Sequence, residues 1–158
     1  MKQEGGMKMK IVTFCGHRDS IITKEVEIWL INIVEQLIQS GETVFYLGGY
    51  GAFDTRSAWI VHQAKQKCPQ VESVLVTPYL NFRPDPLCHE LYDSLLYPPL
   101  ESVPRRLAIL RRNKWMAEQC DILVAFLERR TGGAYQTFQW AEKRQKTIIQ
   151  YPNNPFTV

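Results

Sequence analysis

Short apolar runs alternate along the chain with longer segments that repeat an apolar residue every three or four positions. The runs are rich in β-branched and aromatic residues, which favour strands, and they cover residues 9–15, 43–47, 73–79, 121–127 and 147–151. The segments between them predict helices over residues 22–40, 54–68, 104–119 and 134–144. Strands that are apolar throughout and alternate with helices are typical of a parallel sheet covered on both faces. We therefore predict an α/β fold with a doubly wound, mainly parallel, five-stranded sheet of order 3-2-1-4-5.

The chain of 158 residues suits a single domain. Residues 1–8 are polar and charged, so we expect a flexible leader ahead of one domain over residues 9–158. Residues 80–103 are rich in proline and aromatic side chains. A connector in such a fold has about 4–6 residues, so we expect a flap that closes over a ligand or packs against a second subunit. Exposed aromatic residues in this flap favour a homo-oligomer.

Composition narrows the classes of partner. The net charge of +3 is mild, so we do not expect nucleic acid as a partner. No apolar run approaches the roughly 20 residues that cross a bilayer, so we expect no membrane association. The four cysteines form no C-x-x-C pair and the three histidines give no zinc spacing, which predicts no metal site. Cys15 and Cys120 border apolar runs, so we expect buried thiols in a reduced, cytoplasmic protein.

Glycines gather directly after three of the predicted strands. The first strand is followed by GHRDS (16–20), the second by GGYGAFD (48–54) and the fourth, after a few residues, by RRTGGAYQT (129–137). Ligands of such sheets bind at the carboxyl ends of the strands, so we expect these turns to converge on one ligand. Glycine lets backbone N–H groups approach a phosphate, and a helix N-terminus adds partial positive charge. The alternative is that these glycines only make tight turns.

Side chains in these turns suit an anionic ligand. Arg18 offers a bidentate guanidinium, and Thr55 or Thr137 offers a hydroxyl donor. Asp54 either accepts a hydrogen bond from a ribose hydroxyl or caps its helix. The chain has neither a P-loop nor a G-x-G-x-x-G fingerprint.

The predicted helix over residues 104–119 is basic and supplies further ligand candidates. Arg105 and Arg112 lie seven residues apart and are expected to share a face, and Arg112 and Asn113 to point toward the ligand. The alternative is a solvated basic face. The complete set of predicted ligand-binding residues is Gly16, His17, Arg18, Gly48, Gly49, Gly51, Asp54, Arg112, Asn113, Gly132, Gly133 and Thr137.

Four motifs, FCGHRD, GGYGAFD, RRNKWM with CDILVAF, and TGGAYQT, resemble in order and spacing the SLOG superfamily of Rossmann-like nucleotide-binding proteins. That superfamily includes the lonely-guy phosphoribohydrolases and DNA-processing protein A, and the chain is most similar to a small bacterial YpsA-like branch. The resemblance covers residues 9–151. It implies a Rossmann-like fold and a nucleotide or ADP-ribose-like ligand, without a required cofactor. It also implies that Gly132, Gly133 and Thr137 cradle a phosphate and that Arg112 is a functional arginine.

The chain departs from the lonely-guy pattern at the catalytic position. Those enzymes follow P-G-G-x-G-T with two acidic residues, whereas Phe138 and Gln139 stand here. Glutamine cannot act as a general base, so the sequence favours a protein without that activity. Asp54, Glu142 and Arg112 remain the candidates for catalysis.

Three functions follow from these residues. The favoured one is a sensor or regulatory module that binds a nucleotide or nucleotide-derived ligand. The first alternative is a nucleotide N-glycosidase or phosphoribohydrolase-like enzyme with Asp54 or Glu142 as acid/base. The second is binding of single-stranded DNA, as in DNA-processing protein A, through arginines of the basic helix: Arg105, Arg106, Arg111 and Arg112.

Overall fold

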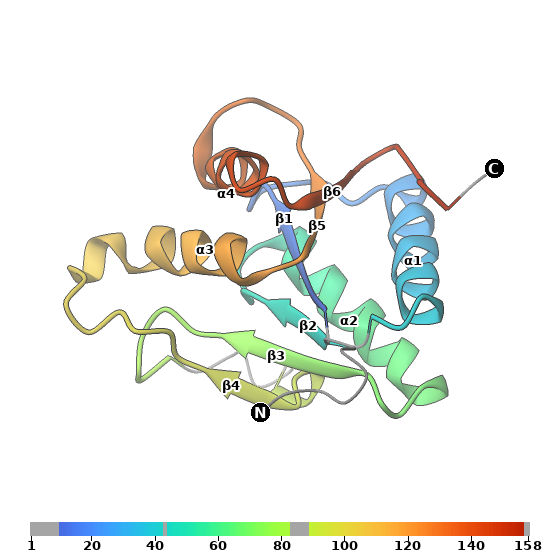
Figure 1. The fold of residues 1–158 in the computed structure, drawn as a ribbon, viewed down its shortest axis with the longest axis horizontal. Helices are drawn as coiled ribbons and strands as arrows, with labels where there is room; N and C mark the ends of the chain where they lie inside the picture. The colour runs from blue at the N-terminus through green and yellow to red at the C-terminus, as the bar shows by residue number, and fades with distance from the viewer. Residues whose placement is uncertain (1–9, 43, 83–88, 157–158) are drawn as a thin grey trace.

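The computed structural model describes residues 10–42, 44–82 and 89–156. Within them, six strands form one parallel sheet of order β4-β3-β2-β1-β5-β6 (Figure 1). The strands are β1 (Ile11–Gly16), β2 (Val44–Leu47), β3 (Glu72–Val76), β4 (Ser94–Leu96), β5 (Ile122–Phe126) and β6 (Thr147–Gln150). The predicted leader over residues 1–8 lies outside the described residues.

The predicted α/β fold and the predicted strand order are confirmed, with one strand added. The five predicted strands correspond to β3, β2, β1, β5 and β6 in the expected spatial order. The sixth, β4, lies within residues 80–103 and pairs with β3 at the edge of the sheet. It has three residues, and Leu95 is 54% exposed. A strand so short and so exposed gives only a brief apolar run, residues 95–97, and the surrounding prolines make the sequence favour a flap. Residues 83–88 of that stretch lie outside the described residues.

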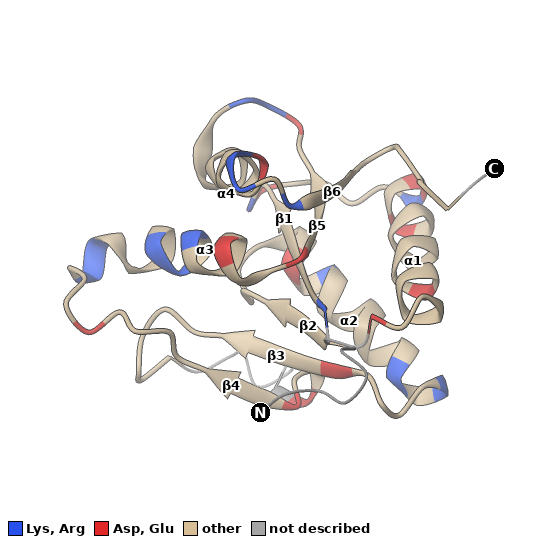
Figure 2. Cartoon of the chain, viewed as in Figure 1, with Lys and Arg blue, Asp and Glu red and all other residues tan. Residues whose placement is uncertain are grey.

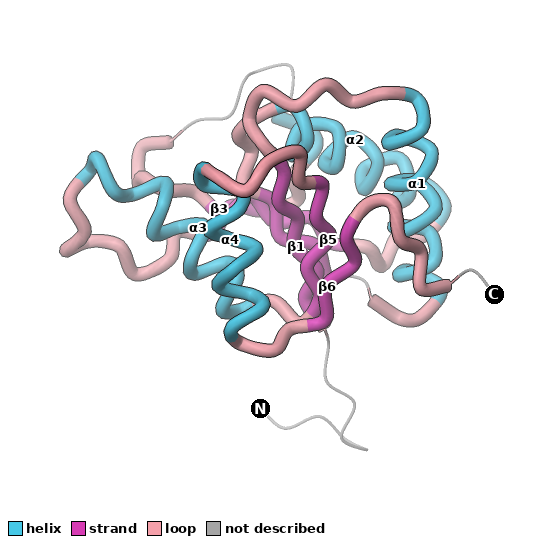
Figure 3. Tube along the Cα trace, turned by 90° about the horizontal axis from the view of Figure 1, so that it is seen from above, coloured by secondary structure: helices cyan, strands magenta, loops and turns pink. Residues whose placement is uncertain are grey.

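Helices cover both faces of the sheet. Figure 3 shows α1 (Lys24–Gln39) and α2 (Ala52–Lys67) on one face, and α3 (Ala108–Gln119) and α4 (Gly132–Lys143) on the other. Two short 3₁₀ turns, η2 (His89–Leu91) and η3 (Arg105–Leu107), complete the described elements. In the part of the chain that the structure describes, no helix combines the length and apolar character needed to span a membrane.

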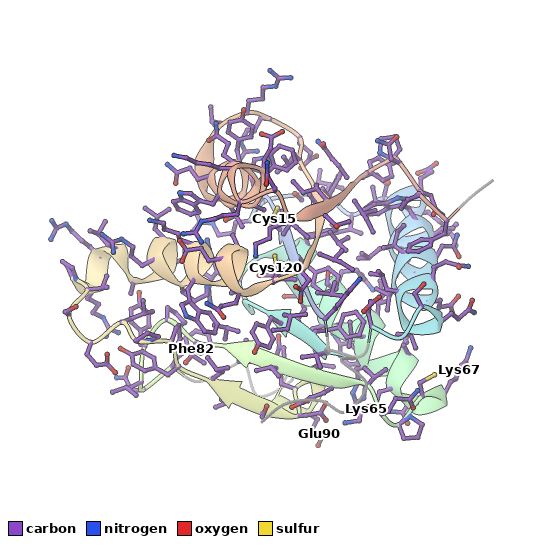
Figure 4. All side chains as sticks on the ribbon, in the orientation of Figure 1. Cys15, Lys65, Lys67, Phe82, Glu90 and Cys120 are labelled. Carbon is purple, nitrogen blue, oxygen red and sulfur yellow. The ribbon has the colours of Figure 1, made fainter. Side chains whose placement is uncertain are left out.

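Each face of the sheet has its own apolar layer. Beneath α1 and α2, aromatic rings stack on one another, with the centroids of Phe14 and Phe45 6.2 Å apart. Beneath α3 and α4 the layer is built from smaller side chains, including Cys15 and Cys120 (Figure 4). The two cysteines are buried free thiols, as the sequence predicted.

The helices differ in how their N-termini are capped. Thr23 caps α1 because its side-chain oxygen accepts a hydrogen bond from the N–H of Val26 at 3.3 Å. The N-cap residues of α2 and α4, Gly51 and Thr131, make no side-chain capping bond. Both of these helices follow glycine-rich turns at the carboxyl edge of the sheet. Their first N–H groups therefore lack a side-chain acceptor at the edge where ligands of this fold class bind.

Candidate functional site

The turns after β1, β2 and β5 converge on one cavity of about 340 Å³, which α3 closes from the side. The cavity lies at the carboxyl edge of the sheet, as expected. Its wall contains most of the predicted ligand-binding residues: Gly16, His17, Arg18, Gly48, Asp54, Arg112, Asn113, Gly132, Gly133 and Thr137. Gly49 and Gly51 do not line it. The role of these residues in binding stays a prediction, but the structure does bring the set together.

Three of the glycines are explained by packing inside the protein. A Cβ on Gly16 would lie 2.6 Å from Phe53, and a Cβ on Gly51 would lie 2.8 Å from the Cα of Arg18. Gly49 has φ +68°, and a Cβ there would lie 2.6 Å from Leu75. At these three positions, neighbouring atoms of the protein itself leave no room for a side chain. For Gly16, Gly49 and Gly51, the alternative that the glycines only make tight turns is therefore a sufficient explanation.

Gly132 and Gly133 are different because no protein atom crowds them, although the φ of Gly132, +86°, also favours glycine in this turn. A Cβ on Gly132 would meet no atom within 4 Å, and one on Gly133 would meet only Asn113 Nδ2 at 3.8 Å. Both residues line the cavity at the start of α4. The uncapped N-terminus of α4 is therefore accessible to a ligand.

His17 connects two of the three turns. Its side chain is only 2% exposed, and its Nε2 lies 3.1 Å from the carbonyl oxygen and 3.2 Å from the backbone nitrogen of Arg129. Nε2 accepts from the Arg129 N–H in one tautomer and donates to the carbonyl in the other. His17 thus holds the β5–α4 turn against the β1 turn, and its ring is one wall of the cavity.

Two exposed arginines stand at the mouth of the cavity, each held by a neighbour. Arg18 donates a hydrogen bond to the hydroxyl of Tyr50, and its guanidinium lies 5.3 Å from the centroid of that ring. Arg129 pairs with Asp19, with 3.1 Å between Nη2 and Oδ1. The sequence analysis missed Tyr50, Asp19 and Arg129 as lining residues. All three lie within the glycine-rich turn motifs, and this position in the sequence could have identified them as lining residues.

Arg112 is a charged side chain that is only 1% exposed. Its Nη1 donates to the carbonyl oxygens of Gly48 (2.9 Å) and Val76 (2.7 Å), and its Nε donates to Asn113 Oδ1 (2.9 Å). Burial lowers the pKa of the guanidinium, while the nearby Asp54 opposes that shift. Arg112 therefore ties β2, β3 and α3 together and presents fixed positive charge to the cavity.

Asp54 lies in the first turn of α2, but the N-cap residue of that helix is Gly51. Its Oδ2 accepts from the N–H of Tyr50 at 3.4 Å, whereas its Oδ1 is buried without a hydrogen-bond partner. Burial raises the pKa of the carboxyl to about 6, against the opposing charge of Arg112 and the N–H groups of Tyr50 and Gly48. The helix-cap interpretation from the sequence is therefore wrong, because Asp54 accepts from Tyr50, which precedes α2, and not from an N–H of the helix.

The other candidates lie less favourably. The Thr137 hydroxyl donates to the carbonyl oxygen of Gly133 at 2.8 Å, so its hydrogen is engaged within α4. Thr55 lines a separate hollow beside α1. Glu142 is exposed and lines hollows on the outer side of α4, away from the cavity. Phe138 stacks against Tyr135 at a centroid distance of 6.2 Å.

The basic helix begins later than the sequence predicted. Residues 105–107 form the 3₁₀ turn η3, and the α-helix starts at Ala108. The prediction that Arg105 and Arg112 share a helix face is therefore wrong: Arg112 is buried, and Arg105 is exposed with its guanidinium 4.0 Å from the ring centroid of Tyr79. Arg106 and Arg111 are also exposed. Within the described ranges, no cluster of three His, Cys, Asp or Glu side chains could hold a metal ion.

These features define a Rossmann-like domain with one polar, arginine-lined cavity at its carboxyl edge. No protein-family model matches the chain, and no curated protein matches it either. Solved structures match it by fold. DNA processing protein A from Helicobacter pylori, described for its single-stranded DNA binding mode, is similar with a TM-score of 0.64 and 18% identity over 93% of this chain and 67% of that chain.

Two further structures share the architecture. DNA processing protein A from Streptococcus pneumoniae has a TM-score of 0.68 and 17% identity over 94% of this chain, which spans 52% of that chain. The molybdenum cofactor carrier protein from Chlamydomonas reinhardtii has a TM-score of 0.57 and 14% identity over 90% of this chain and 76% of that chain. The predicted Rossmann-like fold is thus confirmed. Membership of the SLOG superfamily and of its YpsA-like branch stays a prediction.

The comparisons contradict one expectation from the sequence. Nucleic acid was not expected as a partner because the net charge is only +3. A protein with this fold, H. pylori DNA processing protein A, is nevertheless described for its single-stranded DNA binding mode. Net charge averages over the whole surface, whereas nucleic acid responds to local clusters of Lys and Arg. Figure 2 shows such clustering along η3 and the first half of α3.

Proposed function

We propose that the cavity binds a nucleotide or nucleotide-derived ligand through its phosphate. One observation carries the proposal: the open N-terminus of α4, at Gly132 and Gly133, faces the same cavity as Arg18, Arg112 and Arg129. Unpaired N–H groups at a helix N-terminus attract an anion, and guanidinium groups add charge-assisted hydrogen bonds. A phosphate can use both at once.

A binding module explains the cavity better than the lonely-guy chemistry does. Phe138 and Glu142 lie outside the cavity wall, and Gln139 is exposed. Among the described residues, the carboxylates that line the cavity belong to Asp19 and Asp54, and Asp19 is paired with Arg129. A ligand would instead link the turns of β1, β2 and β5, which suits a sensor whose surface changes when the cavity is filled.

Calorimetry with a matched pair of variants tests the proposal. Gly133→Asp places a negative charge at the start of α4, where an acidic residue does not oppose helix formation. Gly133→Asn adds a side chain of similar size without charge. We expect AMP, ADP, ATP, ADP-ribose or inorganic phosphate to bind the wild type, and the Asp variant to lose at least about tenfold more affinity than the Asn variant. Failure of all five probes to bind the wild type would refute the proposal.

A second candidate function is binding of single-stranded nucleic acid. The observation that favours it is the exposed surface formed by Arg105, stacked on Tyr79, with Arg106 and Arg111 beside it. A cation held on an aromatic ring next to further arginines can contact both bases and phosphates. Figure 2 shows this basic segment at the free end of α3.

Anisotropy of a labelled oligothymidine at several salt concentrations tests this candidate. We expect Arg105→Ala/Arg106→Ala/Arg111→Ala to weaken binding and to reduce the salt slope by about two. The control is the equally charged triple variant Lys67→Ala/Arg130→Ala/Lys143→Ala, whose exposed residues lie on α2, the β5–α4 turn and α4. Figure 4 places Lys67 at the opposite side of the molecule from η3. Equal losses in both variants would show only nonspecific attraction and reject the candidate.

A further inference from the structure

Asp54 is a carboxyl group of the cavity wall that its neighbours satisfy only in part. Among the described residues, its Oδ1 is buried without a hydrogen-bond partner, and its Oδ2 accepts from the N–H of Tyr50 at 3.4 Å. A buried charge is costly unless hydrogen bonds and an opposite charge compensate for the loss of water. The surroundings of Oδ1 therefore favour the neutral acid over the carboxylate.

Charged and titratable groups lie around Asp54 on several elements. From α3, the Arg112 guanidinium favours the ionised carboxylate, although its Nη1 is engaged with two backbone carbonyls. From β1, the Cys15 thiol lies near the carboxyl and stays neutral, because burial raises its pKa. Burial of Asp54 itself outweighs Arg112 and raises the pKa of the carboxyl to about 6. The other titratable or charged side chains of the cavity wall are His17, Arg18, Asp19, Tyr50 and Arg129.

An anion in the same cavity would change the balance between the two forms of Asp54. A cavity of about 340 Å³ keeps a bound anion within roughly 8 Å of a carboxylate in its wall, and like charges at that distance repel enough to change an affinity tenfold or more. Protonation of the carboxylate removes this repulsion. Because coupling between two binding events is reciprocal, the anion must strengthen proton binding at Asp54 by the same factor.

We propose that anion binding in the cavity is coupled to the uptake of a proton by Asp54. This inference rests on the proposed function and adds a regulation of the same site by pH. At pH 7 and above, the free protein holds Asp54 mostly ionised, so filling the cavity draws a proton from solution. Below about pH 5 the proton is already bound, and the anion binds without further uptake. The affinity for an anion therefore rises as the pH falls, and the module responds to its ligand and to acidity together.

Calorimetry with inorganic sulfate tests the coupling, because sulfate has the shape of phosphate and keeps its charge between pH 5 and 8. Titrations at pH 6.5 in two buffers of different ionisation enthalpy give the number of protons taken up per anion. We expect uptake of about half a proton at pH 6.5, and roughly tenfold tighter binding at pH 5 than at pH 8. Binding without proton uptake and with an affinity independent of pH would overturn the inference while leaving the anion site intact.

Inorganic phosphate is the second probe. If phosphate binds and sulfate does not, the same titrations use phosphate, and the uptake by Asp54 is the difference between the wild type and Asp54→Asn. The proton exchange of phosphate itself cancels in that difference, because both proteins bind the same anion. No difference between the two proteins would overturn the inference. Failure of both anions to bind the wild type would instead refute the proposed function.

Asp54→Asn and Asp19→Asn form a matched pair, because each removes one carboxylate from the cavity wall. Asp19 is exposed, and its hydrogen bond with Arg129 lowers its pKa, so it stays ionised throughout the range tested. We expect Asp19→Asn to keep the proton uptake of the wild type and Asp54→Asn to lose most of it. Uptake that persists in a folded Asp54→Asn protein would assign the proton to another wall residue, such as His17, and overturn the role of Asp54.

A spectroscopic measurement on the wild type covers the case in which Asp54→Asn does not fold. The ¹³C resonance of the Asp54 carboxyl carbon reports its protonation directly as the pH is changed. We expect its titration midpoint to move to higher pH when the anion that binds, sulfate or phosphate, saturates the cavity. A midpoint that does not move would show that anion and proton bind independently, and would overturn the inference.

Discussion

Asp54 and Arg112 face each other across Gly48 without forming a direct ion pair. A Cβ on Gly48 would lie 2.8 Å from Asp54 Oδ2 and 3.3 Å from Arg112 Cζ. Arg112 instead donates hydrogen bonds to two backbone carbonyls and to Asn113. The arrangement keeps a buried carboxylate and a buried guanidinium available beside the cavity, at the cost of excluding any side chain from Gly48.

Gly48→Ala should destabilise the protein and reduce ligand binding. The added methyl group must displace the Asp54 carboxylate or the Arg112 guanidinium, and such overpacking costs about 1–3 kcal/mol. The control is Gly133→Ala, where the added Cβ meets only Asn113 Nδ2 at 3.8 Å and the helix gains propensity. Urea denaturation measures both variants. Equal stabilities of the two variants would contradict the crowding at Gly48.

The stability of the protein should depend on the protonation of Asp54. Its pKa of about 6 in the folded state lies above the ordinary value of 3.8, so the folded protein holds this proton more tightly than the unfolded chain. The contribution of Asp54 is therefore greatest below about pH 4, falls as the pH rises to about 6 and is constant above that. At about 1.36 kcal/mol per pH unit, the loss amounts to about 3 kcal/mol.

Comparison with Asp54→Asn separates this effect from other titrations. We expect the stability difference between variant and wild type to shift in favour of the variant between pH 4 and 6. Denaturation at pH 4, 5, 6 and 7 measures the difference, and the contributions of all other groups cancel because both proteins contain them. A difference that does not change with pH would contradict the burial of the carboxyl.

Arg129→Ala should weaken the binding of inorganic phosphate by about tenfold, since a charge-assisted hydrogen bond is lost. Arg130 offers a control because it is adjacent, equally charged and exposed, but lines a different hollow. We expect Arg130→Ala to retain nearly the wild-type affinity in the same calorimetric titration. Comparable losses of phosphate affinity in the two variants would show that the turn attracts phosphate only through its net positive charge, without a specific contact from Arg129.

His17→Ala should loosen the β5–α4 turn. The substitution leaves the backbone of Arg129 without its buried partner, which costs about 1–3 kcal/mol. Hydrogen exchange measured by mass spectrometry should show faster exchange of the amides of residues 129–133. His17→Gln keeps a side chain able to accept and to donate and should restore part of the protection. Unchanged exchange in His17→Ala would show that the turn is held by other contacts.

Cys15 and Cys120 should resist alkylation in the folded protein. Burial raises the pKa of both thiols, that of Cys120 to about 12, so little thiolate forms at pH 8. Cys68 is half-buried and should react faster. Mass spectrometry of iodoacetamide-treated peptides, with a urea-unfolded sample as the reference, measures the three rates. Fast labelling of Cys15 would show that the layer beneath α3 and α4 opens readily.

The strand order and the helices could be predicted from the sequence because short apolar runs and a helical apolar period reflect burial directly. The same signal failed for β4, whose three residues are largely exposed and depend on pairing with β3. It also failed at the start of α3, where Pro104 precedes a 3₁₀ turn rather than the α-helix itself. An element that is stabilised by contacts with neighbouring elements, and not by its own apolar pattern, is hard to predict from the sequence.

The candidate site, too, could be predicted only in part from the sequence. The glycine-rich turns marked the cavity correctly, because strand carboxyl ends must meet at one edge of a parallel sheet. The sequence could not show that Gly16, Gly49 and Gly51 accommodate the protein itself while Gly132 and Gly133 are open to a ligand. That distinction depends on which atoms approach each backbone.

By itself, then, the sequence determined the α/β class, the topology and the turns that meet at the site, because these follow from apolar periodicity and glycine placement. Only the tertiary structure decided which charged side chains lie at the cavity and which lie elsewhere. It buried Arg112, left Arg105 exposed on Tyr79 and set the Asp54 carboxyl beside Gly48. The solvation and the partners of a charged side chain arise from contacts between distant segments, and the order of residues along the chain does not specify them.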